Sequence, residues 1–588
     1  MNSETKQCQN CKNQFTIELE DFTFYEKICV PPPTWCPECR FFRRAIFRNE
    51  RKFFKGTDGL RGEPLISFWP PELGFSVYRD KDWWTQDLWD PLQFGQEFDP
   101  RRPFLAQILD IFKKVPKMAT FAINMVRSEY SGNADDLKNC YLLFNSNHTE
   151  DSAYGNGVDF CRNCYDNSHI QKTELSYNSF FLTNCYETHF SVQCEGCVGM
   201  WFSKNCRGCT NCFGCINLRS QKYCIFNQQY SPEEYEKRLG AMRLHTWSGL
   251  QAAELQAYEF WLKHPNKFMQ GVQNTNVSGE YITHSRNIRK SYIIRESENL
   301  KYTQYSQVPS SRECMDATFI GSQSELFYEV SICGWNATNL RFCWDCWDGG
   351  RDLEYSISCG RMAANLFGCV GITRQQYCIL NKQYAKEEYM KLRDTIVKHM
   401  NEVPYIDALG RIYKYGEFFP PEFSPFAYQH TIVPEHFPMM REEVENYGAH
   451  WQDPNPSEYE ITMSSDAIPD SIIDINDDIL AEVIRCGNCR RAYRLIGPEL
   501  HFLKQHKIPA PRMCVDCRHY ARIAHRNKAR LYERQCQCFG VVSQNGLYKN
   551  TAPHIHENTK CPNEFETSYA PDRPEIVYCE ECYQNEVA

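Results

Sequence analysis

Polar and apolar residues alternate over short stretches near both ends of the chain. The pattern appears in Phe15-Thr-Ile17 and again in Tyr493-Arg-Leu495. Alternation with a period of two predicts short strands that bury one face. In both places a proline-bearing loop follows, and a helical stretch comes after it. Each end of the chain is therefore predicted to hold a hairpin, a loop and a helix.

The middle of the chain has a different pattern, in which asparagine repeatedly precedes cysteine. The pairs are Asn139-Cys140, Asn163-Cys164, Asn184-Cys185 and Asn205-Cys206, at nearly even spacing. An interval of roughly 20 residues between pairs suits one coil of a parallel β-solenoid, with a turn-forming Asn and a small buried Cys in register. Helical patterns that begin after Ser231 and Ala385 would cap the open edges of the stack.

An internal repeat relates the two ends of the chain. A constant offset of 478, without a gap, superposes one four-cysteine module on the other. It places Cys8, Cys11, Cys36 and Cys39 on Cys486, Cys489, Cys514 and Cys517, and Arg40, Arg44 and Arg48 on Arg518, Arg522 and Arg526. We interpret the ends as copies of one module.

A second duplication lies between these modules. Residues from about 128 to 240 match those from about 278 to 394 at an offset that drifts around 150. For example, Phe-Gly-Cys215 corresponds to Phe-Gly-Cys369. The repeats predict a multidomain, β-rich protein with zinc modules at both ends and a duplicated, Cys-rich, solenoid-like middle with capping helices.

The patterns divide the chain into eight predicted segments. These are a treble-clef zinc module (1–56), a degenerate metal-free ribbon (57–90), a helical connector (91–127), two solenoid-like repeats with C-terminal helices (128–265 and 266–400), a connector rich in Pro and aromatics (401–480), a second treble-clef zinc module (481–534) and a zinc ribbon (535–588).

Composition narrows the class of protein. The 588 residues carry a net charge of −9, which excludes a globally basic nucleic-acid coat. The 32 cysteines fall largely in C-x2-C pairs, and the polar start of the chain lacks the apolar core of an export signal. No run approaches the roughly 20 apolar residues of a membrane span. We therefore expect a cytoplasmic protein with reduced cysteines and no membrane partner.

Zinc is the cofactor that these cysteines predict. Each terminal module reads C-x2-C-x24-C-x2-C, and four thiolates close the tetrahedral shell that Zn²⁺ prefers. A first knuckle, a hairpin and a helix that carries the last ligands form a treble-clef arrangement. The alternative is a redox dithiol, which two identically spaced quartets disfavour.

A third zinc site is predicted in the C-terminal ribbon. Cys579 and Cys582 form its knuckle, and Cys561 is the best third ligand. The fourth ligand is ambiguous among Cys536, Cys538, His554 and His556, and we assign Cys538. At an offset of 500, Arg79 and Asp82 stand where the knuckle cysteines would be. The N-terminal ribbon is therefore predicted to lack the metal and to depend on aromatic burial around Trp83 and Trp84.

The terminal modules resemble a zinc-ribbon domain family of bacterial proteins. The shared pattern reads here Cys8-Gln-Asn-Cys11, Phe15, Glu20, Phe24-Tyr25, Pro31-Pro-Pro33 and Cys36-Pro-Glu-Cys39-Arg40. The C-terminal copy departs from it at Val515 and Asp516, inside the knuckle. The last unit is similar to another bacterial ribbon type, marked by Arg-Pro and then Val-Tyr-Cys-x2-Cys. The resemblance implies zinc, and it implies no particular activity.

The arginine rows after the knuckles are candidate binding residues. Arg40, Arg44 and Arg48, like Arg518, Arg522 and Arg526, recur every four residues and so share one helix face. Guanidinium groups in a row can grip a phosphate backbone, which predicts nucleic-acid binding, most readily of RNA. The alternative is a solvated helix face that pairs with the protein's own acidic residues. The partner is thus a nucleic acid or, if the protein is an interaction scaffold, another protein.

The cysteines of the middle allow a metal interpretation as well. Cys206, Cys209, Cys212 and Cys215 follow the spacing of an iron–sulfur run. The aligned residues of the second copy are Gly360, Ala363, Leu366 and Cys369, which favours a packed interior instead. Cys194/Cys197 of the first copy and Cys343/Cys346 of the second form corresponding pairs. A small metal site at these pairs is therefore kept as an alternative.

Catalytic motifs are missing from the sequence. It contains no phosphate-binding Gly loop, no G-x-S-x-G and no H-E-x-x-H. Asp159 and Asp166 could mimic the acidic pair of a solenoid enzyme that acts on carbohydrate, although carboxylates in Asn/Asp-rich turns are more often turn formers. Aromatics of the connector could stack on bases, but packing is the favoured interpretation. We predict a non-enzymatic protein.

Overall fold

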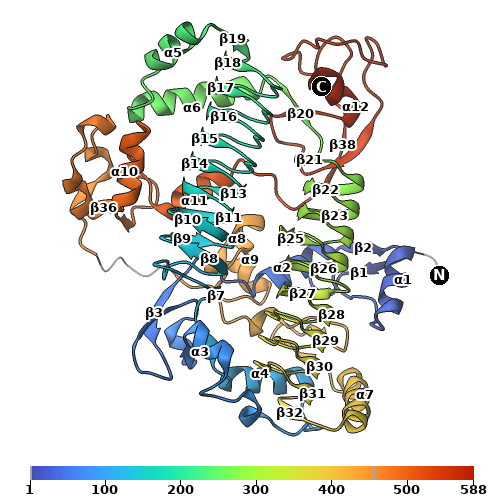
Figure 1. Cartoon of the computed structure of the whole chain (residues 1–588). Helices are drawn as coiled ribbons and strands as arrows, with labels where there is room; N and C mark the ends of the chain where they lie inside the picture. The colour runs from blue at the N-terminus through green and yellow to red at the C-terminus, as the bar shows by residue number, and fades with distance from the viewer. Residues whose placement is uncertain (1–2, 454–458, 588) are drawn as a thin grey trace. The chain divides into compact units, whose positions relative to one another are not determined.

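The chain folds into two compact units, each built from segments that lie far apart in the sequence. The computed structural model describes residues 3–453 and 459–587. Unit 1 comprises Met1–Thr120, Met269–Asp453 and Lys528–Leu531, and unit 2 comprises Phe121–Phe268, Pro454–Asn527 and Tyr532–Ala588. Unit 1 thus joins the N-terminal module to the second solenoid, and unit 2 joins the first solenoid to the C-terminal module (Figure 1).

The solenoid of unit 2 is a parallel stack of short strands. They are β7 (Ala122–Ile123), β8 (Ala134–Lys138), β9 (Tyr141–Phe144), β10 (Asn147–Glu150), β11 (Ala153–Asp159), β12 (Arg162–Tyr165), β13 (Ser168–Gln171), β14 (Glu174–Tyr177), β15 (Tyr186–His189), β16 (Val198–Trp201), β17 (Thr210–Phe213) and β18 (Lys222–Ile225). Arg162 pairs with Glu174, and Glu174 pairs with Tyr186. One coil thus takes 12 residues, the separation of the bonded side chains Asn205 and Asn217 in adjacent coils. The stack ends where β19 (Gln228–Gln229) turns back antiparallel to β18.

A repeat of three residues explains the coil. Asn139, Leu142 and Asn145 have φ of 55°, 52° and 52°, and each precedes a buried residue. A left-handed residue at every third position turns the chain sharply, so that four such steps close one coil of four walls. Asparagine tolerates this conformation well, and the small residue after it fits the narrow interior. The Asn-Cys pairs therefore mark corners and inward positions, as the sequence indicated.

The predicted coil length was wrong, because the interval between Asn-Cys pairs is not one coil. Cys140 and Cys164 lie on the same wall two coils apart, whereas the shorter step from Cys164 to Cys185 changes the wall. Any multiple of three residues keeps a side chain pointing inward, whether or not it closes a whole number of coils. The Asn-Cys pairs thus share a role, but they do not form one ladder.

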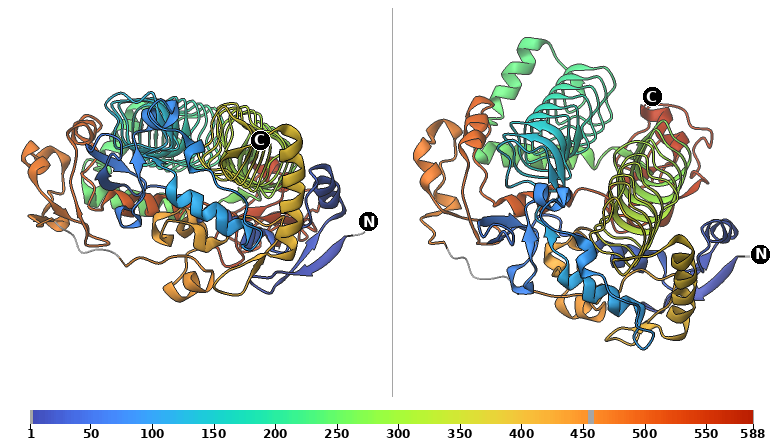
Figure 2. Two further views of the ribbon diagram at one scale, coloured as in Figure 1. Left: turned by 90° about the horizontal axis from the view of Figure 1, so that it is seen from below. Right: turned by 60° about the horizontal axis from the view of Figure 1, so that its bottom comes forward.

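The solenoid of unit 1 repeats this design with longer coils. Its strands are β21 (Gly271–Val272), β22 (Thr275–Thr283), β23 (Arg286–Arg295), β24 (Glu298–Lys301), β25 (Gln304–Ser306), β26 (Arg312–Ile320), β27 (Tyr328–Cys333), β28 (Thr338–Arg341), β29 (Arg351–Glu354), β30 (Ala364–Phe367), β31 (Gln376–Ile379) and β32 (Lys382–Gln383). From β26 to β30 a coil takes 13 residues, the separation of the bonded side chains Asn339 and Asp352. The strand partners Arg312, Glu325, Thr338, Arg351 and Ala364 keep this interval. Four such coils, each with one extra residue, account for the drift of the repeat offset from 150 to 154. Both stacks can be followed in Figure 2.

Helices cap both stacks, as predicted. In unit 2, α5 (Pro232–Ala241) begins after Ser231, whose hydroxyl accepts a hydrogen bond from the Glu234 amide at 3.2 Å, and it packs on β18. In unit 1, α7 (Lys386–Glu402) begins after Ala385 and packs on β31. The closing strands and these helices cover the last coil, which would otherwise present open backbone groups.

The remaining elements of unit 1 surround its solenoid. They are the hairpin β1 (Glu4–Gln7) and β2 (Gln14–Ile17), α1 (Leu19–Lys27), α2 (Pro37–Ala45), the hairpin β3 (Phe54–Thr57) and β4 (Pro64–Ser67), β5 (Val77–Tyr78), α3 (Asp80–Thr85), α4 (Phe104–Lys114) and β6 (Lys117–Met118). The connector adds β33 (Tyr405–Ile406), β34 (Ile412–Tyr413), α8 (Val433–His436) and α9 (Arg441–Asn446). Its phenylalanines Phe418 and Phe419 are fully buried, which confirms packing rather than base stacking for these two rings.

Unit 2 has matching elements around its own solenoid. They are α6 (Trp247–Trp261), β20 (Pro265–Lys267), β35 (Met463–Ser464), β36 (Ile484–Arg485), β37 (Ala492–Tyr493), α10 (Gly497–Gln505), α11 (Val515–Ile523), β38 (Tyr532–Gln535), β39 (Glu564–Thr567), β40 (Ile576–Tyr578) and α12 (Glu580–Val587). Residues 454–458 of the predicted connector lie outside the described residues. Among the described helices, none is long and apolar enough to cross a membrane.

Candidate metal centres and their surroundings

The first cysteine quartet gathers as its spacing predicted. The sulfurs of Cys8, Cys11, Cys36 and Cys39 all lie within 4.8 Å of one another. The first pair closes the hairpin of β1 and β2, and the second pair sits at the start of α2. The Cys36 amide donates to the Cys8 sulfur at 3.2 Å, and the Asn10 side-chain amide donates to the Cys39 sulfur at 3.3 Å. Such N–H···S bonds stabilise thiolates, so the quartet can hold a metal ion.

The second quartet reproduces this geometry in unit 2. Cys486, Cys489, Cys514 and Cys517 also lie within 4.8 Å of one another. The matching hydrogen bonds run from the Cys514 amide to the Cys486 sulfur at 3.2 Å and from Asn488 to the Cys517 sulfur at 3.4 Å. Burial raises the pKa of the Cys489 thiol, whereas hydrogen bonds from Arg491 lower it by a larger amount. The net result is a pKa of about 6. This thiol is thus poised to act as a thiolate ligand.

A third quartet lies in the C-terminal ribbon, and one of its predicted members was wrong. Cys561, Cys579 and Cys582 are joined by Cys536, not by Cys538. Cys536 follows β38 directly, so it faces the knuckle that opens α12. The Cys579 amide donates to the Cys536 sulfur at 3.2 Å, and Asn563 donates to the Cys579 sulfur at 3.4 Å. Spacing could not choose Cys536, because both cysteines lie within three residues in the sequence.

The N-terminal ribbon carries two ion pairs at the positions of this quartet. The strand pairs Phe54–Ser67 and Tyr532–Thr567 have the same register, which equates Asp58 and Arg61 with Cys536 and Cys561. Arg79 and Asp82 stand in place of Cys579 and Cys582. Arg79 contacts Asp58 at 3.2 Å and Arg61 contacts Asp82 at 2.8 Å.

Aromatic burial accompanies these ion pairs. Trp83 is buried and donates from its indole to the Pro116 carbonyl at 2.9 Å, and its ring lies 5.6 Å from that of Trp89. Trp84 is half-buried and stacks edge-on against Trp83. The sequence identified Arg79 and Asp82 as replacements, but it did not identify Asp58 and Arg61, which only the strand register reveals.

The arginine row of unit 1 is buried against the solenoid, which corrects the prediction of a phosphate-binding face. Arg40, Arg44 and Arg48 are at most 3% exposed. Arg40 contacts Asp316 at 2.8 Å, and Arg44 contacts the same carboxylate at 3.2 Å. Burial alone would lower the pKa of Arg40, but Asp316 raises it well above its usual value. Because the row faces the protein interior, it cannot follow a nucleic-acid backbone in this fold.

Arg43 extends the unit 1 network to a balanced cluster. It contacts Glu329 at 2.8 Å and Glu417 at 2.7 Å. Together the cluster sets three guanidinium groups against three carboxylates. Burial raises the pKa of Glu329, and the nearby arginines oppose that shift. Charges buried in this way need their partners, because an unpaired ion in the interior costs several kcal/mol.

The row of unit 2 is buried in the same way, and its arginines contact the equivalent positions of the solenoid. Arg518, Arg522 and Arg526 are at most 6% exposed. Arg518 contacts Asp166 at 2.7 Å and Glu499 at 2.6 Å. Arg522 donates to the Ser168 hydroxyl at 3.1 Å, as Arg44 does to that of Thr318. Arg526 lies 3.2 Å from the His169 ring nitrogen, and Arg48 lies over the Phe319 ring at 4.1 Å. Pairing with the protein's own groups is therefore confirmed, but the expected solvated face was wrong, because both rows are buried.

The sequence held a signal for these carboxylates. Asp166 and Asp316 occupy equivalent positions in Arg-Asn-Cys-Tyr-Asp and Arg-Glu-Cys-Met-Asp of the two solenoid copies. An aspartate that recurs in both solenoid copies, together with an arginine row that recurs in both terminal modules, indicates an internal ion pair. Asp166 therefore forms ion pairs with the arginine row. Asp159 accepts hydrogen bonds from Asn147 at 3.0 Å. Both carboxylates are buried.

The solenoid cysteines line the interior walls. Cys206, Cys209, Cys212 and Cys215 occupy the four walls of one coil and are fully buried. Their thiols donate to backbone carbonyls two residues earlier, as Cys206 does to Lys204 at 3.5 Å. The coil register equates Cys206 with Cys359 and Arg207 with Gly360. The extra corner residue of the longer coil lies at Arg361 and Met362, which have φ of 47° and 64°. The four positions read Cys359, Ala363, Leu366 and Cys369 in unit 1, as a packed interior allows.

The second pair of cysteines also changes partners in the structure. Val192 and Trp344 are equivalent positions in the coils, so Cys194 corresponds to Cys346, and Cys343 corresponds to Ser191. Cys197 has no cysteine counterpart. Cys194, Cys197, Cys343 and Cys346 donate to backbone carbonyls at 3.3 to 3.6 Å. No described residue pairs with them to form a group of metal-ligand spacing.

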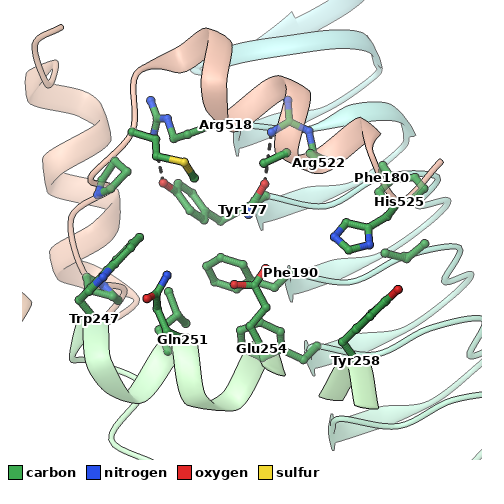
Figure 3. Close-up of a pocket in the computed structure, with 18 of the residues that line it drawn as sticks. Tyr177, Phe180, Phe190, Trp247, Gln251, Glu254, Tyr258, Arg518, Arg522 and His525 are labelled. Atoms are coloured by element: carbon green, nitrogen blue, oxygen red, sulfur yellow. Dashed lines mark hydrogen bonds between the residues drawn. The ribbon is translucent and has the colours of Figure 1, made fainter. Parts of the chain in front are cut away.

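A cavity of about 160 Å³ lies in unit 2 between the solenoid, α6 and the arginine helix α11 (Figure 3). Its walls are largely aromatic, with Tyr177 and Phe190 from the solenoid and Trp247 and Tyr258 from α6. Burial raises the pKa of Glu254 and lowers that of His525, because it disfavours the charged form of each side chain. The cavity is thus an aromatic recess beside the buried ion pairs.

Comparisons with known proteins identify no family for this chain. No protein-family model matches the chain, and no curated protein matches it. Among solved structures, the chain is similar to a crystal structure of a protein assigned as an acetyltransferase from Desulfovibrio desulfuricans G20, at 9% identity and a TM-score of 0.10. That match covers 50% of this chain and 74% of the other. A likeness at this level indicates neither fold nor activity.

Proposed function

We propose that this protein is a non-enzymatic, zinc-stabilised scaffold that binds a protein partner. The observation that carries the proposal is the burial of both arginine rows in ion pairs within their own units. A nucleic-acid interface depends on accessible cations, and these six were the residues best suited to supply them. Their role is instead to fasten each zinc module to a solenoid.

The metal centres support a structural role. Each quartet offers four cysteine sulfurs, which would close the tetrahedral shell of Zn²⁺ and leave no open position for a substrate. The order of knuckle, hairpin and helix in each terminal module supports the treble-clef assignment that the bacterial zinc-ribbon resemblance implies. The protein would then be a cytoplasmic assembly platform whose zinc ions stabilise its binding surfaces.

The C-terminal ribbon offers the surface for a partner. The loop between Cys538 and Cys561 exposes four large apolar side chains: Phe539, Val541, Leu547 and Ile555. Ile555 is 79% exposed. The loop carries only two lysines and one glutamate. Apolar side chains on a loop with so little charge suit a protein surface better than a phosphate backbone.

The test compares the whole chain with a loop variant. Purification of the tag-free protein under native conditions, with and without nuclease, is expected to recover a defined protein partner that withstands nuclease. The variant Val541→Ser/Leu547→Ser/Ile555→Ser is expected to lose this partner. The matched control Leu255→Ser/Met362→Ser, at exposed apolar positions elsewhere, is expected to keep it.

Two results would overturn the proposal. One is recovery of nucleic acid whose binding falls steeply with salt. The other is a partner that the loop variant still binds as well as the parent does. Charge reversal of Arg44 or Arg522 is a poor test of nucleic-acid binding, because a buried glutamate facing Asp316 or Asp166 would unfold the unit instead.

A further inference from the structure

The C-terminal ribbon holds a second group of ligands beside its cysteine quartet. Cys538, His554, His556 and Cys582 present ligand atoms that all lie within 4.8 Å of one another. Cys582 also belongs to the quartet with Cys536, Cys561 and Cys579. Two tetrahedral metal ions need eight ligand positions, and a shared thiolate fills two of them. Seven side chains therefore suffice, and the ribbon supplies seven.

The histidines are oriented as metal ligands are. His554 contacts the Glu586 carboxylate through Nε2 at 2.9 Å, and its Nδ1 lies 3.6 Å from the Cys538 sulfur. His556 contacts the Thr559 carbonyl through Nδ1 at 2.7 Å, and its Nε2 lies 3.3 Å from the Cys582 sulfur. In each ring, the nitrogen away from the sulfurs has an oxygen partner that fixes its proton there. The nitrogen facing the sulfurs is then the one with a free lone pair.

Glu586 ties the loop to the helix that carries the shared thiol. It lies one turn beyond Cys582 on α12, and its side chain is buried. Besides His554, it accepts hydrogen bonds from the Thr551 amide at 2.8 Å and the Ala552 amide at 3.1 Å. A carboxylate that orients a histidine and its loop together is the usual outer-shell support of a zinc site.

The sulfurs of the second group have matching surroundings. Asn550 donates to the Cys538 sulfur at 3.2 Å, as Asn563 does to Cys579 in the quartet. The Cys582 sulfur lies 3.7 Å from that of Cys561 on one side and 3.3 Å from His556 on the other. It is thus placed between the two groups. Five thiolates and two Zn²⁺ ions would give a net charge of −1, whereas five thiolates around one ion would give −3.

The second group belongs to an insertion. The repeat offset is 478 at the first strand of the ribbon and 500 at the second, so the C-terminal ribbon is longer than the N-terminal one by the difference. The extra residues carry Cys538, His554 and His556. They form little regular structure, and a loop of this length needs a local constraint to stay ordered. A metal ion held between the loop and α12 supplies that constraint.

We propose that the C-terminal ribbon binds two zinc ions bridged by the Cys582 thiolate, the second of which fastens the inserted loop. The chain then binds four zinc ions: one in each terminal module and two in this ribbon. The bridged site stands independently of the scaffold function, because it rests on the ligands alone.

Metal analysis of the tag-free full chain tests the proposal. Elemental analysis is expected to find four zinc ions per chain. His554→Ala/His556→Ala is expected to bind three, because it keeps the cysteine quartet intact. The control His501→Ala, at an exposed histidine of the same unit, is expected to bind four. A parent chain with three zinc ions, or a double variant that still binds four, would overturn the proposal.

Cobalt substitution tests the bridge itself without relying on a count. Two Co²⁺ ions joined by a thiolate couple magnetically, so the electron paramagnetic resonance of the fully loaded chain is expected to be weaker than four independent ions would give. His554→Ala/His556→Ala is expected to restore the signal of an isolated ion. Equal signal per cobalt in the two proteins would exclude a shared thiolate. Limited proteolysis adds a structural readout, with faster cleavage between Cys538 and Cys561 expected in the variant.

Discussion

Arg518 donates to Asp166 across 2.7 Å, and both side chains are buried within unit 2. In unit 1, Arg40 makes the same contact with Asp316 at 2.8 Å. The arginines are related by the repeat of the chain ends, and the aspartates by the separate repeat of the solenoids. Each ion pair therefore joins a residue of the repeated terminal module to a residue of the repeated solenoid. The module and the solenoid thus pack together in the same way in each unit.

Loss of Arg40 is expected to destabilise unit 1 strongly. Arg40→Met leaves the Asp316 carboxylate buried without its shortest ion pair, which typically costs about 3–5 kcal/mol. We expect the melting transition of unit 1 to fall by several degrees in calorimetry. Combining it with Asp316→Leu is expected to recover part of this loss, because the second change removes the unpaired charge.

The control for this series is Arg101→Met, at a side chain that is 87% exposed and pairs with the nearby Asp99. Surface pairs contribute about 0–1 kcal/mol, so little change is expected. Equal effects of the two substitutions would mean that the buried network does not hold the module to the solenoid.

The two ribbons predict a transplantable metal site. Asp58, Arg61, Arg79 and Asp82 occupy the positions of the cysteine quartet in the same strand register. The fourfold change Asp58→Cys/Arg61→Cys/Arg79→Cys/Asp82→Cys is expected to add one zinc ion per chain in elemental analysis. The isosteric control Asp58→Asn/Arg61→Gln/Arg79→Gln/Asp82→Asn is expected to add none. If the cysteine variant folds and its zinc content stays at the parent level, the equivalence of the ribbons is wrong.

Asp345 predicts a pH dependence of unit 1. Burial raises the pKa of this carboxyl to about 7, against hydrogen bonds from Ser358 and Trp347 that lower it. The folded state thus keeps the proton that the unfolded state releases above about pH 4. The stability contributed by the protonated carboxyl is complete below that pH and is lost as pH rises toward 7.

Asp345→Asn removes this titration. Its melting temperature relative to the parent is expected to rise between pH 5 and pH 7, by the equivalent of at most about 3 kcal/mol, and to stay level above. Any bound metal would be lost from both proteins alike in acid, so the difference between them isolates the carboxyl. Asp394→Asn, at an exposed carboxylate, controls for surface charge. A constant difference across this range would contradict the prediction.

The left-handed corners of the solenoids predict a strict residue preference. Asn184 has φ of 53° and an exposed side chain, so substitutions there test the backbone alone. Asn184→Val is expected to destabilise unit 2 by about 1–2 kcal/mol in a melting experiment, whereas Asn184→Gly should be tolerated. Tyr186→Val, at a strand position of the same coil, is the control. Tolerance of valine at Asn184 would argue against the three-residue corner.

Local chemistry explains what the sequence could predict about this fold. The terminal quartets were recognisable because C-x2-C places two sulfurs on one turn of chain, whatever surrounds it. Asn139 and Cys140 indicated a solenoid, because a left-handed corner and a narrow interior select these residue types locally. The coil length was missed because each wall imposes a period of three, and every multiple of that period returns a side chain to the interior.

The roles of the arginines and of the last metal ligands depended on contacts between distant segments. Arg44 and Asp316 lie 272 residues apart in the sequence. Helix periodicity shows only that Arg40, Arg44 and Arg48 share a face, never what that face meets. Likewise, Cys536 and Cys538 point in different directions from the end of one strand, so ligand sets follow from strand register and not from spacing.

The sequence by itself determined the two terminal cysteine quartets, the repeats and the inward cysteines, because residue spacing and local geometry are enough to recognise each of them. Only the tertiary structure decided that the arginine rows form buried ion pairs with the solenoids and that Cys582 lies between two ligand groups. The physical reason is that the role of a charged group or a lone pair depends on the groups that surround it, and those groups come from distant segments that only folding brings together.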